Sequence, residues 1–300
     1  MGLDHEERSV SGYRYSTAAT AREAANWSTG RVLRANLRAT FGRAYPRIIG
    51  LTREPSWIFF EILLPFLAVS AFVFVYRALN APEEYIGFVV VGGAMTAFWL
   101  NVVWMMAAQF SWEKDQGNLE LYFTAPMHLM SILVGMAIGG LVMTGSRALA
   151  VIAVGSFLYG VEYHVTNPLG LIGIFFLTLA PLYGMGMLFA SLFLMWGREA
   201  FHLAQMLQEP IYFLGGVNVP LRALGPIAGL VAATLPLAVG LDAMRQLAFP
   251  GPESTGVLPV GVEALILAAM AIVFVVAARF ALAYLERLAR LEGRLTLRWQ

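Results

Sequence analysis

Residues 57–76 read WIFFEILLPFLAVSAFVFVY, an unbroken apolar run with a single charged side chain. A helix of about 20 mostly apolar residues is long enough to cross the hydrocarbon core of a bilayer. Six comparable runs follow it along the chain, at 86–110, 129–159, 171–195, 201–219, 226–249 and 260–285. This repetition predicts an all-α integral membrane protein.

The composition supports that fold class. Hydrophobic residues make up 59% of the 300 residues and charged residues 13%, with a mean hydropathy of +0.68. Soluble domains are about 45–50% apolar and about 25% charged, and disordered chains are less apolar still. The composition therefore excludes a soluble globular enzyme and a disordered chain. A net charge of +1 gives no support for a nucleic-acid partner.

The seven runs are not expected to span the membrane equally. Run 201–219 ends in two glycines and a proline, and run 226–249 is interrupted by prolines, among them Pro236. Irregular backbone at membrane depth is tolerated where protein shields it. We therefore predict six full spans within residues 51–286, with a re-entrant segment at 220–250 before the last span.

The arginines predict the orientation. Nine arginines precede residue 57 and five follow residue 278. By the positive-inside rule both ends are cytoplasmic, which requires an even number of spans. We expect a multi-pass protein of the cytoplasmic membrane, with a polar tail at 1–30, a basic tail at 287–300 and an internal loop at 111–128.

Residues 31–50 form a separate amphipathic segment. Arginines flank an apolar stripe on both sides, and the stripe follows the 3.6-residue helical period at Leu33, Leu37, Phe41, Ala44 and Ile48. The pattern favours an interfacial helix lying in the membrane plane, in contact with lipid headgroups. The alternative is a soluble amphipathic helix that covers another domain.

Catalytic motifs are missing from the sequence. A P-loop needs a lysine after a glycine-rich turn, but the only lysine, Lys114, follows Glu113. The four histidines are scattered, and there is no cysteine. We therefore predict no catalytic residue, no metal site and no cofactor in this chain.

The internal loop is the most informative polar stretch. Residues 109–128 read QFSWEKDQGNLELYFTAPMH, with charges first, then a glycine, then an apolar face closed by a proline. A short amphipathic helix of this kind suits docking to another protein. A plain solvated loop is the alternative.

Two stretches resemble ABC transporter permeases of the type-2 export class. The loop sequence EKDQGNLELYFTAP at 113–126 is similar to the family's cytoplasmic loop, and the segment LPLAVGLDAMR at 235–245 is similar to the family's stretch before the last span. The matching residues are Glu113, Gln116, Gly117, Leu119, Glu120, Thr124 and Pro126 in the loop, and Pro236, Asp242 and Arg245 in the second stretch.

The resemblance implies a function. Such a chain would be the permease of an ATP-driven exporter, paired with a second copy and with two ATPase subunits that bind ATP and Mg. The cargo would be amphipathic or hydrophobic: a drug-like molecule, a lipid or a lipid-linked glycan. The loop would be a coupling helix, turned by Gly117, and its ATPase-facing residues would be Glu113, Lys114, Asp115, Gln116 and Glu120.

Two ionisable residues lie inside predicted spans. Glu61 and Arg147 each occupy a depth where a charge costs about 2.5–3.5 kcal/mol. They could line the translocation pathway or a dimer seam, or they could form a structural ion pair. An ion-coupled secondary transporter without an ATPase is the alternative function, and it would need paired carboxylates or broken helices in both halves of the chain.

Three further features have both a functional and a structural interpretation. Phe98, Trp99 and Trp104 could line a pathway or face lipid. Asp242 and Arg245 have the i, i+3 spacing of a structural pair. The pattern Gly135-x-x-x-Gly139 permits close helix approach but is common by chance in membrane sequences.

Overall fold

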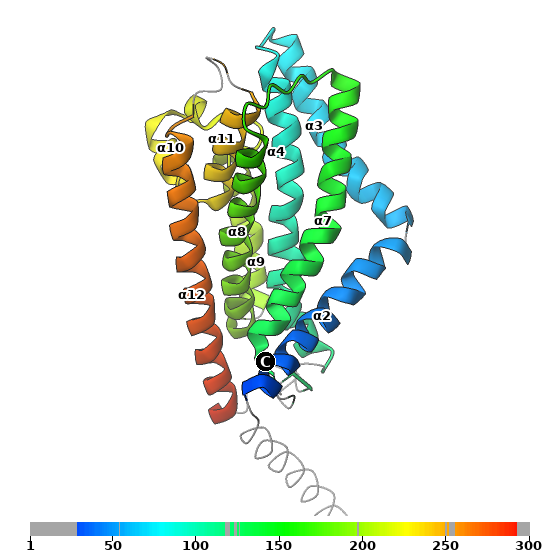
Figure 1. Ribbon diagram of the computed structural model, residues 1–300, viewed down its shortest axis with the longest axis vertical. Coiled ribbons are helices and arrows are strands. Elements are labelled where there is room, and N and C mark those ends of the chain that lie inside the picture. Colours follow the sequence, from blue (N-terminus) through cyan, green and yellow to red (C-terminus); the bar gives the residue numbers. More distant parts are fainter. Residues whose placement is uncertain are drawn as a thin grey trace, which may run out of the picture.

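The computed structural model describes residues 29–292 except 54, 118–120, 123, 124, 126, 197, 250 and 252–255. All elements in this part of the chain are helices, arranged as a bundle (Figure 1), and none is a strand. The all-α prediction is therefore confirmed. The polar tail before residue 29, Glu120 of the loop and the tail after residue 292 lie outside the described residues.

Five helical stretches among the described residues are long and apolar enough to cross a membrane. They confirm a multi-pass membrane protein and fall where the sequence predicts spans. The elements that contain them are α3 (Pro55–Ala78), the continuous stretch of α4 (Glu84–Leu100), the π-helix η1 (Asn101–Ala107) and α5 (Gln109–Asp115), then α7 (Leu129–Tyr159), α8 (Pro168–Trp196) and α12 (Val260–Glu292).

The fifth predicted span differs from the others. It corresponds to α9 (Arg198–Leu214), which is 17 residues long and is not one of the five candidate spans. The helix continues through Pro210 and ends before Gly215 and Gly216, the second of which has a φ of 65°. The count of six spans stays a prediction.

Short helices follow α9 at one end of the bundle, the upper end in Figure 1. They are η2 (Leu221–Leu224), α10 (Gly225–Ala232) and α11 (Pro236–Ala248), with Pro236 in the first turn of α11. Arg245 donates to the carbonyls of Gly216, Val217 and Phe88 at 2.6, 2.8 and 2.9 Å. These bonds satisfy irregular backbone inside protein, which is the condition for such backbone at membrane depth. The re-entrant path itself stays a prediction.

The amphipathic segment forms α2 (Thr29–Arg53), which crosses α7 obliquely (Figure 1). The predicted stripe divides between two faces. Ala44 is buried, whereas Leu33, Leu37 and Phe41 are each at least half exposed. Ala44 is buried because the α2 backbone passes close to Gly139 of α7: a Cβ built at Gly139 would lie 3.1 Å from the Ala44 carbonyl oxygen. The exposed residues keep an apolar face open, and its placement in the membrane plane stays a prediction.

Candidate functional site

The chain leaves α4 through the π-helix η1 and then enters α5, which begins the loop at 111–128. A π-helical turn inside an α-helix is uncommon and is often found at functional sites. Gly117 follows α5 with a φ of 77°, a left-handed conformation that suits glycine. Gly117 therefore lies in a turn, and its role in a coupling helix stays a prediction.

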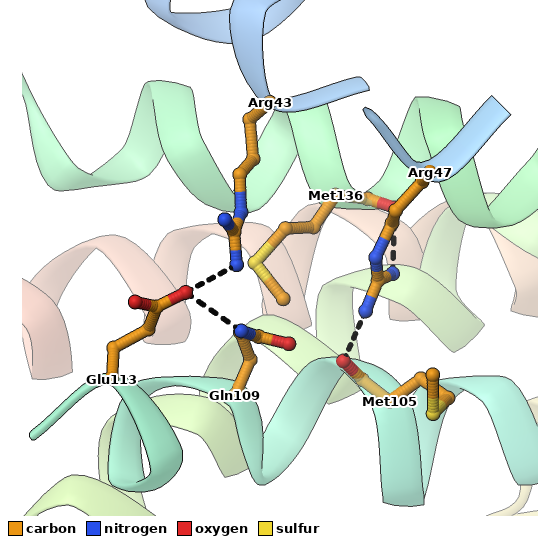
Figure 2. A network of polar contacts seen from close by, with 6 residues as sticks. All are labelled: Arg43, Arg47, Met105, Gln109, Glu113 and Met136. Atoms are coloured by element: carbon orange, nitrogen blue, oxygen red, sulfur yellow. Dashed lines mark hydrogen bonds and ion pairs between the residues drawn. The ribbon is translucent and has the colours of Figure 1, made fainter. Parts of the chain in front are cut away.

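Glu113 of α5 points toward α2, as Figure 2 shows. Its Oε1 lies 2.6 Å from Nη2 of Arg43 and accepts a bond of 2.8 Å from Nε2 of Gln109. Glu113 is 5% exposed. Burial raises the pKa of the neighbouring Tyr122, while Arg43 opposes this rise and Glu113 adds to it. The residue predicted to face an ATPase is therefore bonded inside its own chain.

Arg47 lies one helical turn after Arg43 and reaches the π-helix. Its guanidinium donates to the carbonyl of Met105 and to that of Met136, the latter at 3.3 Å (Figure 2). Burial lowers the pKa of Arg47 to about 10, and the nearby positive charge of Arg43 is the second cause of this decrease. The side chain therefore stays charged at neutral pH and links η1 to α7 through α2.

The end of the loop is also attached to α2. The backbone N–H of His128, just before α7, donates to Oδ1 of Asn36 at 2.9 Å. Oγ1 of Thr40 donates to the carbonyl of Ser131 at 3.0 Å. Both side chains come from α2, so this helix holds the two ends of the loop, one through Glu113 and the other through His128.

Three side chains near Glu113 are at least partly exposed. Trp112 is 39% exposed, Gln116 is exposed and Lys114 is half-buried. The structure does not describe the side chain of Asp115, and Glu120 lies outside the described residues. No cluster of metal-ligating side chains occurs in the described part of the chain. The arrangement suits transmission of movement from a bound protein to helices α2, η1 and α7.

Glu61 of α3 and Arg147 of α7 form an ion pair inside the bundle. Arg147 is 8% exposed. The pair matches the structural alternative for these residues. A role on a pathway or at a dimer seam stays untested.

The aromatic residues of the second span have different surroundings. Phe98 and Trp99 are buried in the core, at 0% and 2% exposure. Trp104 is half-buried, and its Nε1 donates to Oε1 of Gln208 on α9 at 2.9 Å. Trp104 therefore connects the second span to α9.

Asp242 and Arg245 use their hydrogen bonds on different partners. Arg245 donates to carbonyls, while Oδ2 of Asp242 accepts from the N–H of Val257 at 2.8 Å. Sequence reasoning missed two residues beside them. Gln246 donates to the carbonyl of Leu258 and to Oε2 of Glu263, and Glu263 is 2% exposed. The sequence contained one signal that could have identified Glu263: it is a carboxylate near the start of an apolar run.

The contacts of Arg43 and Arg47 were also missed, because both were assigned to lipid headgroups. Their partners lie 58 to 89 residues away in the sequence. No local pattern identifies such partners.

Comparison with known protein families relates the chain to a family of transporters. The family described as ABC-2 type transporter matches residues 47–249. No curated protein matches the chain.

Proposed function

Since the chain belongs to the ABC-2 type transporter family, a family of membrane transport permeases, we propose that it is the permease subunit of an ATP-binding-cassette exporter. In this proposal two copies of the chain pair with two ATPase subunits, which bind ATP and Mg. The complex lies in the cytoplasmic membrane with both chain ends in the cytoplasm, six spans, an interfacial α2 and a re-entrant segment at 220–250. The cargo is amphipathic or hydrophobic.

The observation that carries the proposal is the ion pair between Arg43 and Glu113, at 2.6 Å. It joins the loop at 111–128 to α2, which also contacts η1 and α7 through Arg47. A force applied to the loop would therefore act on two spans at once. A loop that merely connected two spans would not need this attachment.

The side chains around the loop divide into two groups. Glu113 and Arg43 position α5 from inside, whereas Trp112, Lys114 and Gln116 offer surface to a partner. ATP binds one conformation of such a complex more tightly than another, and this difference in affinity shifts the spans between states. We assign ATPase contact to the outward group and transmission to the inward group.

The test is co-purification of an ATPase subunit with the full-length chain from its native membrane, followed by ATP hydrolysis measured on the purified complex. We expect Lys114→Ala/Asp115→Ala/Gln116→Ala to lose the subunit. We expect Glu113→Gln to keep it but to lose most of the hydrolysis that depends on the complex, because Arg43 then lacks its anionic partner. Arg38→Gln, an exposed arginine on the same helix, is the matched control and should change neither result.

Absence of an ATPase subunit from the folded wild-type preparation would overturn the proposal. Equal loss of the subunit from the triple variant at residues 114–116 and from Arg38→Gln would overturn the assignment of the loop.

A further inference from the structure

The helix α9 presents an open face that the bundle does not cover. His202, Gln205, Met206, Glu209 and Phe213 are all exposed on it, with Met206 at 75% and Phe213 at 64%. The helix starts at Arg198, two residues after the end of α8. At a rise of 1.5 Å per residue, Glu209 lies about 16 Å along the helix. In the proposed sixth crossing, which begins at Arg198, this position is about halfway through the ~30 Å hydrocarbon core.

A carboxylate at this depth cannot have lipid as its neighbour. On insertion scales a charge at the centre of a membrane helix costs about 2.5–3.5 kcal/mol. Both ion pairs recorded for the described residues involve other carboxylates, Glu113 and Glu61. Glu209 therefore requires water or a cation that the described part of the chain does not supply.

Pro210 adds a second oxygen acceptor beside this carboxylate. Proline has no N–H, so the carbonyl of Met206 lacks the donor that a helix normally provides four residues later. The helix nevertheless continues to Leu214. In an α-helix the carbonyl of Met206 points along the axis toward Pro210, so this free oxygen lies in the same helical turn as Glu209.

A second copy of the chain would not neutralise Glu209 with the arginines found inside the bundle. Arg147 is bonded to Glu61, and Arg245 donates to three carbonyls. The same residues in a second copy would be engaged in the same way. Among the groups that could reach Glu209, a positively charged cargo is the cation that the proposed transport function itself supplies.

We propose that this face of α9 binds the cationic group of an amphipathic organic cation. The inference rests on the proposed transport function and names its substrate class. Met206 and Phe213 contact the apolar body of the cargo, since methionine adapts to irregular shapes. The bond from Trp104 to Gln208 fixes α9 against η1 and so holds Glu209 at its depth.

The test compares two probes of the same shape and opposite charge, tetraphenylphosphonium and tetraphenylborate. Their binding to the complex, purified in detergent with the full-length chain, is measured by equilibrium dialysis. We expect the cation to bind at least tenfold more tightly than the anion. Glu209→Gln should weaken cation binding about tenfold or more, as loss of a charge partner in a site of intermediate dielectric requires, without weakening anion binding.

Two further variants allow the inference to be tested even if Glu209→Gln folds poorly. Pro210→Ala restores the N–H that pairs with the carbonyl of Met206, so cation binding should weaken severalfold with no change of charge. Glu162→Gln, an exposed carboxylate beyond the end of α7, is the matched control and should bind both probes as the wild type does.

Equal affinity for the two probes would overturn the inference, as would unchanged cation binding in both Glu209→Gln and Pro210→Ala. The proposed function fails separately, because binding of the probes does not require an ATPase. Cation binding that depends on Glu209 supports this site even where no ATPase subunit co-purifies. An intact ATPase complex that does not bind the cation overturns the site alone.

Discussion

Glu61 and Arg147 form an ion pair in which each charge needs the other if the folded protein is to be stable. Breaking a buried pair on one side leaves an uncompensated charge, at a cost of about 3–5 kcal/mol, whereas replacing both partners with apolar residues is often neutral. We therefore expect Glu61→Leu and Arg147→Met each to lower the thermal unfolding temperature clearly, and the double variant to recover most of the loss. Tryptophan fluorescence during heating in detergent measures this, since the chain has seven tryptophans.

The same double variant tests the alternative function. A structural ion pair can be replaced without loss of transport, whereas the centre of an ion-coupled carrier cannot. Transport that survives in the stable double variant supports the exporter. A stable double variant without transport would support ion coupling through Glu61 and Arg147.

At the scale of elements, the contact between α2 and α7 depends on small residues. A Cβ at Gly135 would lie 2.4 Å from the carbonyl oxygen of Thr40, which belongs to the backbone and cannot turn away. We expect Gly135→Ala to push α2 from α7 and to lower stability by about 1–3 kcal/mol, the usual cost of overpacking. Gly145→Ala on the same helix is the control, because nothing lies within 4 Å of its Cβ position.

The control should leave stability unchanged or raise it by up to about 1 kcal/mol, because alanine favours a helix more than glycine does. Thermal unfolding and limited proteolysis between α2 and α3 measure both variants. Equal effects of the two substitutions would show that the close approach at Gly135 is unimportant.

Local signals explain which elements could be predicted. The long apolar helices were predictable because span length and apolarity are properties of one segment, as in residues 57–76. The turn at Gly117 was predictable because it needs only one residue type. The bounds of α9, Arg198–Leu214, differ from those of the apolar run at 201–219, because a proline ends a helix in one setting and is tolerated in another. The helix continues through Pro210 beside an open face.

The inner contacts of the candidate site could not be predicted in the same way. The stripe on α2 correctly indicated an amphipathic helix, but the burial of Ala44 depends on a glycine of α7. Arg43 and Arg47 looked like headgroup ligands, since arginines beside an apolar stripe usually are. Their true partners, Glu113 and two carbonyls, lie on elements that only the folded bundle brings near them.

The number of crossings is a property of the whole molecule. Five candidate spans are found among the described residues, an odd number. Yet the start of α2 and the end of α12 lie at the same end of the bundle in Figure 1. Five crossings alone would place these ends on opposite sides. We therefore predict that the chain returns across the membrane between α8 and α12, where α9 and the short helices after it are the segment available for that return.

Cysteine labelling tests this argument, because the chain has no cysteine and so gives no background. We expect Asn80→Cys and Glu162→Cys, in exposed turns, to react with a membrane-impermeant maleimide in intact cells. Thr29→Cys and Arg287→Cys should react only after the membrane is opened, because an even number of crossings returns both ends to the cytoplasm. Labelling of Thr29→Cys and Arg287→Cys from opposite sides would mean that α9 to α11 turn back within one leaflet. In that case the five spans would be the full count, and Glu209 could not line a route across the membrane.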